Sequence, residues 1–209
     1  TFGVSQVAET TRSTLAFQIT DDLSGAFRYT RIGNWSGLEE TYDRSFDLKY
    51  RVWDEGTYAP AVSVGLQDFI GTGIYSAEYI VATKTIGALE TSAGLGWGRL
   101  GSYHPMGRNG TRPTGTANTG GQIESARWFQ GSFAPFAAVN WTATDRLTIK
   151  AEYSSDAQTQ EVSRNHFERT SPFNFGFDYQ FGKRSQLSAY MLHGSELGLM
   201  FTFVADPKN

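Results

Sequence analysis

Strict alternation of apolar and polar side chains recurs along this chain and limits the folds it can adopt. In segment 173–181 the odd positions are Phe or Tyr, and the even positions are Asn, Gly, Asp and Gln. Successive side chains of a β-strand point to opposite faces, so this order predicts a strand with one apolar and one polar face. The same order returns in segments 43–53, 147–154 and 196–203. No stretch of useful length has a helical period, so the sequence predicts an all-β fold.

Weaker copies of the alternation bring the expected number of strands to about twelve. They occupy segments 2–8 (the least regular), 14–20, 23–31, 60–66, 77–86, 89–99, 133–141 and 186–193. Short connections such as Asp21-Asp22 and Gly87-Ala88 are typical of hairpin turns. The long connections are segments 32–42, 68–76, 101–127 and 155–172. This order predicts an up-and-down antiparallel meander with short turns at one end and long loops at the other.

Three features favour a transmembrane β-barrel over a soluble β domain. The strands approach the nine to eleven residues of a tilted membrane crossing. Aromatic side chains such as Trp141 and Phe203 sit near strand ends, where they suit the headgroup zone. The polar faces mix charges that could pair across an enclosed interior. We therefore expect a lumen lined by Arg28, Asp47, Lys49, Arg51, Glu90, Lys150, Glu152 and Asp178. Hydrocarbon offers no partner to an open sheet edge, so the barrel must close, with an even strand number.

The composition excludes several classes of protein. The chain has no Cys, which rules out disulfides and Cys-ligated metals. A net charge of −3 argues against a nucleic-acid partner, and 14% aromatic residues argue against disorder. No linker or charge run divides the chain, so residues 1–209 are expected to form a single β-barrel domain. No apolar leader opens the sequence, so either a signal was removed or the domain belongs to a longer protein.

Candidates for catalysis are weak. His104, His166 and His193 have no partner at metal-ligand spacing, and salt bridges account for the carboxylates more simply than a glycosidase pair does. We therefore expect no catalytic residue, no metal site and no cofactor.

Segment 61–101 carries the densest motifs of the chain: GLQDFIGTG (65–73), YSAEYIVATK (75–84) and GLGWGRLG (94–101). These motifs resemble the signature of the YjbH-like family of Gram-negative outer-membrane proteins tied to exopolysaccharide production. The resemblance implies a bacterial outer-membrane location, contact with outer-membrane lipid, and a part in making or exporting a polysaccharide. It also implies a polysaccharide chain and other secretion-system proteins as partners. Family members are usually much longer than 209 residues, and the resemblance supplies no catalytic residues.

Glycines in and near these motifs share the polar face of their strands. They are Gly65, Gly94, Gly96 and Gly98. One interpretation is a slot for a bulky neighbour such as Trp53 or Tyr190, because glycine often marks close approach by another group. The other is a smooth groove for a sugar chain.

Three functions are consistent with these observations. The first is a non-enzymatic outer-membrane barrel that assists exopolysaccharide secretion or assembly. The second is an outer-membrane enzyme acting on lipid or glycan, for which loss of turnover on substituting Glu152 or His193 would be diagnostic. The third is a soluble carbohydrate-binding β domain, which plain buffer would extract from membranes without detergent.

Overall fold

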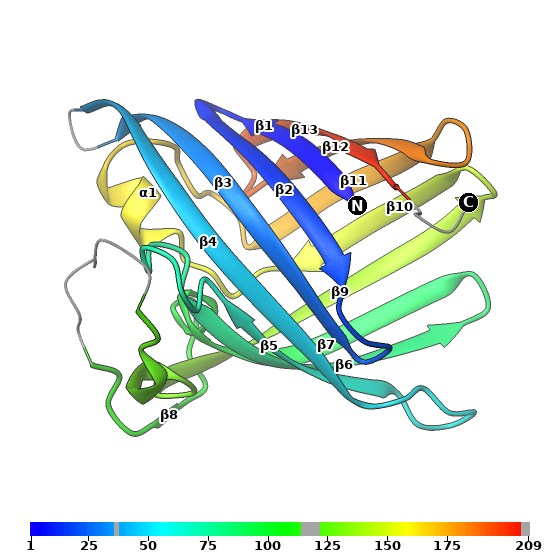
Figure 1. The fold of residues 1–209 in the computed structure, drawn as a ribbon, viewed down its shortest axis with the longest axis horizontal. Coiled ribbons are helices and arrows are strands. Elements are labelled where there is room, and N and C mark those ends of the chain that lie inside the picture. Colours follow the sequence, from blue (N-terminus) through cyan, green and yellow to red (C-terminus); the bar gives the residue numbers. More distant parts are fainter. Residues whose placement is uncertain (36–37, 114–121, 206–209) are drawn as a thin grey trace.

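In the computed structural model, which describes residues 1–35, 38–113 and 122–205, twelve antiparallel strands close into a barrel (Figure 1). These strands are β1 (Phe2–Val7), β2 (Thr10–Gln18), β3 (Leu23–Trp35), β4 (Leu38–Trp53), β5 (Ala61–Gln67), β6 (Ala77–Ile86), β7 (Leu89–Gly98), β9 (Gly131–Thr144), β10 (Leu147–Tyr153), β11 (Phe173–Gln180), β12 (Ser185–Leu192) and β13 (Glu196–Phe203). The connections add the 3₁₀ turns η1 (Arg99–Gly101) and η2 (Ser125–Arg127), the short strand β8 (Gly107–Asn109) and the helix α1 (Thr159–Ser163).

The pairing of the first strand with the last closes the barrel, and each of the other strands of the wall pairs with the strands before and after it. β1 pairs with β13, with Phe2 opposite Phe203, and β9 pairs with β10. Each barrel strand therefore has a neighbour on both sides, which leaves no open edge to meet hydrocarbon. The least regular predicted strand, segment 2–8, is β1, and the barrel cannot close without it. β8 pairs only with the first residues of β9, beyond the part that meets β10.

The two faces of the strands meet different surroundings. On β11 the side chains of Phe175, Phe177 and Tyr179 point outward and are 50%, 45% and 44% exposed. Asn174, on the opposite face, is buried. The buried polar side chains of the inner wall include Thr30, Asp43, Ser45, Ser63, Ser188 and Thr202. An apolar outside around a polar inside is the arrangement of a transmembrane barrel and the reverse of a soluble one, which confirms the predicted fold class. Among the described residues, no helix is long and apolar enough to cross a membrane.

The two ends of the barrel differ. At the turn end lie the β2–β3, β4–β5, β6–β7, β9–β10 and β11–β12 connections, together with the start of β1, marked N in Figure 1, and the end of β13. The opposite end, here called the loop end, carries the long β5–β6, β7–β9 and β10–β11 connections, with β8 and α1 on the left of Figure 1.

The predicted loop at 32–42 is wrong. β3 and β4 continue through most of it as one long hairpin, paired as far as Trp35 and Leu38. The rings of Tyr29 and Tyr42 stack across the two strands with centroids 5.8 Å apart, and Arg31 forms an ion pair with Glu40. Such cross-strand pairs stabilise a ladder where the polar sequence alone indicates a loop.

Part of the β7–β9 connection folds against the outward face of the barrel. Glu78 on β6 is buried and accepts hydrogen bonds from Arg112 Nη1 at 2.6 Å and Nη2 at 2.9 Å, and from the Phe129 backbone N–H at 3.0 Å. Trp97 on β7 packs against Phe129 and Phe133 and is only 8% exposed. This connection therefore covers the wall of the barrel at the loop end.

Candidate functional site

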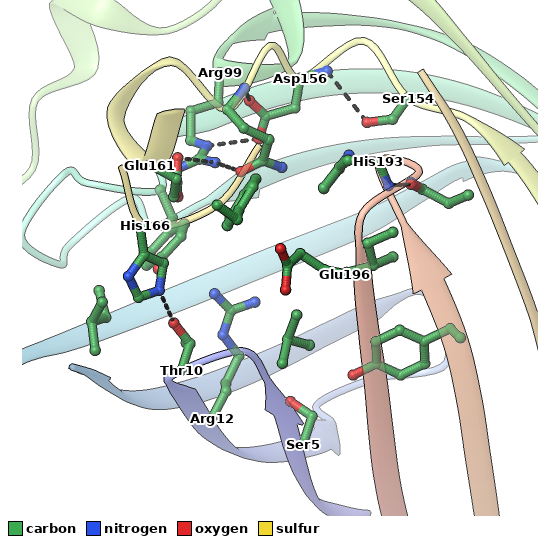
Figure 2. Close-up of a pocket in the computed structure, with 18 of the residues that line it drawn as sticks. Ser5, Thr10, Arg12, Arg99, Ser154, Asp156, Glu161, His166, His193 and Glu196 are labelled. Atoms are coloured by element: carbon green, nitrogen blue, oxygen red, sulfur yellow. Dashed lines mark hydrogen bonds and ion pairs between the residues drawn. The ribbon is translucent and has the colours of Figure 1, made fainter. Parts of the chain in front are cut away.

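The barrel interior holds a cavity of about 380 Å³ near the loop end, here called the loop-end chamber (Figure 2). Its wall combines charged side chains of both signs with aromatic rings. These include Arg12, Arg28, Tyr75, Arg99, Glu152, Asp156, Glu161, Tyr190, His193 and Glu196. Inward-facing strand positions supply some of these residues, and the β5–β6 and β10–β11 connections supply others.

A second cavity of about 820 Å³, the turn-end chamber, lies nearer the chain ends and is lined in part by Lys49, Asp47 and Tyr79. The boundary between the two chambers is charged. Arg28 lines the loop-end chamber, Asp47 lines the turn-end chamber, and Arg28 Nη2 lies 2.7 Å from Asp47 Oδ1. Gln67 lines both chambers. An ion pair between two expected lumen residues therefore lies where one chamber gives way to the other.

Tyr75 enters the loop-end chamber from the β5–β6 connection. Its ring centroid lies 4.7 Å from Arg12 Cζ, 4.9 Å from Arg99 Cζ and 5.9 Å from Arg28 Cζ. A guanidinium over an aromatic face is attracted by the ring's negative face. The three cations come from β2, η1 and β3, so the ring spans the interior between separate parts of the wall. Burial raises the pKa of the Tyr75 hydroxyl, which keeps it protonated.

The GLQDFIGTG motif fastens this connection to the inner face of β4. The Asp68 backbone N–H donates to Asp47 Oδ1 at 2.9 Å, and the Tyr75 backbone N–H donates to Asp68 Oδ2 at 3.0 Å. The Thr72 hydroxyl donates to Asp43 Oδ1. The motif therefore builds an inward-folded connection that positions Tyr75 inside the barrel.

Asp68 carries an unusual carboxyl. Burial raises its pKa from the ordinary 3.8 to about 7, and the neighbouring Asp43 adds to the rise. One oxygen of each carboxyl, Oδ1 of Asp68 and Oδ2 of Asp43, is buried without a hydrogen-bond partner. Arg28 and Asp47 also face this group, with opposite effects on its pKa. In the folded protein the protonated form of Asp68 is therefore favoured up to about pH 7.

We expect the inward position of the β5–β6 connection to weaken as the pH rises through about 7. A raised acid pKa contributes stability that is fully present below its ordinary 3.8 and is lost as the pH passes the folded value of about 7. Ionic conductance of the purified protein in planar bilayers should thus rise between about pH 4 and about pH 7 and level off above that range. Asp68→Asn keeps an oxygen acceptor for the Tyr75 N–H, stays neutral and tolerates the positive φ of 52° at this position. The conductance of the Asp68→Asn protein should not change with pH. If its conductance rises with pH as steeply as that of the wild type, Asp68 is not the titrating group.

Arg99 fastens the β10–β11 connection to the end of β7. It donates to Asp156 Oδ2 at 2.7 Å, to Glu161 Oε1 at 2.8 Å and to Gln158 (Figure 2). Although burial lowers the pKa of Arg99, the carboxylates of Asp156 and Glu161 raise it further, so the net pKa lies above its ordinary value. Breaking a buried pair of this kind leaves an uncompensated charge, so the cluster holds the chamber wall in place.

The register of the strands places all eight expected lumen residues on the inward-facing side. Besides Arg28 and Asp47, one further pair is joined, because Lys150 Nζ lies 2.5 Å from Asp178 Oδ2. Glu90 accepts a hydrogen bond from Asn140 at 2.8 Å.

The remaining three expected lumen residues lie at different depths of the barrel. Lys49 lines the turn-end chamber, and Glu152 lines the loop-end chamber, where it accepts a hydrogen bond from Asn174 at 3.3 Å. Arg51 lies at the turn-end rim, 2.8 Å from both Asp22 and Asp54. The eight residues thus form pairs and single contacts along the interior and do not form one site.

Three of the four glycines expected to form a glycan groove, Gly65, Gly94 and Gly96, face the interior, but side chains fill the space over them. A Cβ at Gly65 would overlap the ring of Tyr79, one at Gly94 would overlap the ring of Phe136, and one at Gly96 would overlap Leu100. Gly98 has a φ of +63°, and a Cβ there would press on the Ser76 carbonyl and on Arg112, which packs against the outward face of the barrel. The structure therefore shows slots for bulky neighbours in place of an open groove.

Tyr190 fills a similar slot elsewhere. It pairs directly with Gly176 on β11 and Gly198 on β13, and a Cβ at either glycine would overlap Tyr190. Its ring covers Gly198 on the wall side and lines the loop-end chamber.

The sequence did not single out Arg12, Tyr75, Arg99 or Tyr190 as site residues. A signal existed for two of them, because Tyr75 and Arg99 lie in the YSAEYIVATK and GLGWGRLG motifs. Arg12 lies in a run, Thr10 to Ser13, that is polar on both faces and so was not included in the predicted strand.

Twelve antiparallel strands closed around a polar, divided lumen define the class: a porin-like transmembrane β-barrel. Two solved porins share the fold. The NanC porin aligns with a TM-score of 0.56 at 8% identity, over 98% of this chain and all of the porin. The KdgM porin, solved in complex with disordered oligogalacturonate, aligns with a TM-score of 0.54 at 7% identity, over 98% of both chains.

The family described as exopolysaccharide biosynthesis protein YbjH, the YjbH family, matches residues 1–209. The lipoprotein YjbH of Escherichia coli K12 is 33% identical over 161 residues, which cover 73% of this chain and 23% of that protein. The chain therefore belongs to the YjbH family, as the motifs of segment 61–101 predicted. It matches about a quarter of the length of this relative.

Proposed function

We propose that this barrel is a non-enzymatic outer-membrane unit that assists the secretion or assembly of an exopolysaccharide. The observation that carries the proposal is a polar lumen with a saccharide-sized chamber. The family of this chain is described as an exopolysaccharide biosynthesis protein. The similar KdgM porin was solved in complex with an oligosaccharide, oligogalacturonate. A polysaccharide chain and other secretion-system proteins are the partners we propose.

The apolar outer face supports a location in the bacterial outer membrane, in contact with its lipid. Bacterial barrels of this kind place short turns in the periplasm and longer loops outside the cell. In that orientation the loop-end chamber faces the outside, and the turn-end chamber faces the periplasm.

Glu152 and His193 are the residues whose substitution would reveal an enzyme. Each makes contacts that support a structural role. Asn174 donates to Glu152 at 3.3 Å and accepts the His193 backbone N–H at 2.8 Å. The His193 ring stacks on Phe167 with centroids 5.5 Å apart. Burial lowers the pKa of His193 to about 4, with Arg169 adding to the effect, so the ring is neutral at physiological pH. These contacts support a framework role for both residues.

The test is secreted polysaccharide in a strain that lacks the gene, complemented with the whole protein or its variants. Deletion should lower secreted polysaccharide, and complementation with the wild type should restore it. Glu152→Gln and His193→Asn should restore it equally well, because neither group performs turnover in this proposal and glutamine keeps a side-chain oxygen that accepts hydrogen bonds. Asparagine suits position 193, where φ is +56°.

Heat-modifiable migration in electrophoresis checks that each variant forms a folded barrel. Loss of output in Glu152→Gln or His193→Asn with the barrel intact would favour the enzyme alternative. Normal output in the deletion strain would contradict the proposal itself.

A further inference from the structure

Arg12 differs from the other two guanidinium groups around Tyr75. Arg28 is paired with Asp47, and Arg99 is paired with two acids of the β10–β11 connection. Within the part of the chain that the structure describes, Arg12 has no carboxylate within 4.0 Å, and its one hydrogen bond runs from Nε to Thr30 Oγ1 at 3.2 Å. That bond orients the guanidinium, which projects into the loop-end chamber (Figure 2), and neither Nη atom donates a hydrogen bond to a residue that the structure describes.

Tyr190 offers an aromatic surface in the same chamber. Gly198 on β13 leaves room for its ring, and Gly176 on β11 leaves room for its Cβ. Ser5 on β1 and Arg12 on β2 follow around the barrel from β13, and both line the chamber. A ring held against the wall needs no rearrangement to receive a flat ligand, and an aromatic face suits the apolar C–H side of a sugar ring.

Acceptors complete the chamber. Glu196 projects into it (Figure 2), and Glu152 lines it with Asn174 as its hydrogen-bond partner. Carboxylates accept hydrogen bonds from sugar hydroxyls, whereas a free guanidinium fork matches a carboxylate with two parallel bonds. A ligand with one anionic group and several hydroxyls satisfies both sets, with its charge at Arg12 and its hydroxyls toward the glutamates.

We propose that the loop-end chamber binds a sugar unit that bears a carboxylate, with the carboxylate on Arg12 and the sugar ring on Tyr190. This inference rests on the proposed function and deepens it, because it assigns an acidic polysaccharide as the chain that is handled. Tyr75 fixes the position of Arg12 through its ring contact at 4.7 Å.

Calorimetric titration of the full-length protein in detergent tests the site, with trigalacturonate as the acidic probe and a neutral trisaccharide, galactotriose, as its match. Trigalacturonate should bind saturably and about tenfold or more tightly than galactotriose, because only the acid uses the Arg12 fork. Arg12→Gln should remove this preference, and Arg12→Lys should restore part of it. Tyr190→Leu should weaken both ligands, and Lys183→Gln, in an exposed turn at the opposite end, should change neither.

Equal affinity for the two trisaccharides, no binding of either, or an acid preference that survives Arg12→Gln would each overturn the inference. If the Tyr190→Leu protein does not form a heat-modifiable barrel, the Arg12 variants still show whether the preference for the acidic trisaccharide depends on Arg12. The polysaccharide output of the deletion strain separates this inference from the proposed function. Lost output with no acid preference refutes the site alone, whereas normal output with an Arg12-dependent preference refutes the export role alone.

Discussion

Substituting arginine for Phe177 is expected to lower the free energy of unfolding by about 2–4 kcal/mol, the cost of a basic side chain near the bilayer midplane on the lipid face of a barrel. Phe177 lies in the middle of β11, between Ile149 of β10 and Ala189 of β12. Its side chain points outward and is 45% exposed. Urea unfolding of the protein refolded in lipid vesicles, followed by tryptophan fluorescence, measures the change.

Gln180→Arg is the matched control on the same strand. Gln180 has the opposite, inward register and lies at the turn end, opposite Gln186 of β12. An arginine there reaches water, so the free energy of unfolding should change little. Equal tolerance of arginine at the two positions would contradict the outward orientation of the apolar face.

Tyr75→Ala should give the largest rise in single-channel conductance of any substitution in the β5–β6 connection. The ring occupies the space between the guanidinium groups of Arg12, Arg28 and Arg99, and alanine leaves that space open. Because cations would then border the passage, reversal potentials in a salt gradient should shift toward anion selectivity. Tyr75→Phe should behave as the wild type, since the ring and not the hydroxyl fills the space.

Tyr58→Ala serves as the control for this experiment. Tyr58 lies in the β4–β5 turn and is 96% exposed, so its removal should leave the conductance unchanged. A Tyr75→Ala protein that conducts like the wild type would show that another group sets the narrowest point of the lumen.

Period-two patterning predicted the fold because a barrel wall repeats one physical rule at every strand: one side chain to lipid, the next to the interior. Closure then follows from the lack of hydrogen-bond partners in hydrocarbon. The rule fails where both faces of a strand meet polar surroundings. The run from Thr10 to Ser13 and much of segment 32–42 are strands in the structure, yet they have no apolar face that could reveal them.

The site was harder to predict because its main elements lie outside that rule. Tyr75 comes from a connection, and no periodicity indicates that a connection folds inward. Parity placed Gly65 and Gly94 on the inner wall, but it could not show that the rings of Tyr79 and Phe136 cover them. Alternation and mixed charge predicted that Arg28 and Asp47 face the lumen. Their contact at the boundary between two chambers depends on a register that the sequence does not state.

The pairing of the first strand with the last also has an architectural consequence. Phe2 and Phe203 are directly opposite one another, at the rim that carries the short hairpins. A polypeptide joined before β1 and one joined after β13 would therefore both emerge at the turn end of the barrel, on the same side of the membrane. The barrel can accordingly be joined to other modules in tandem, with both linkers on one side of the bilayer and no additional crossing.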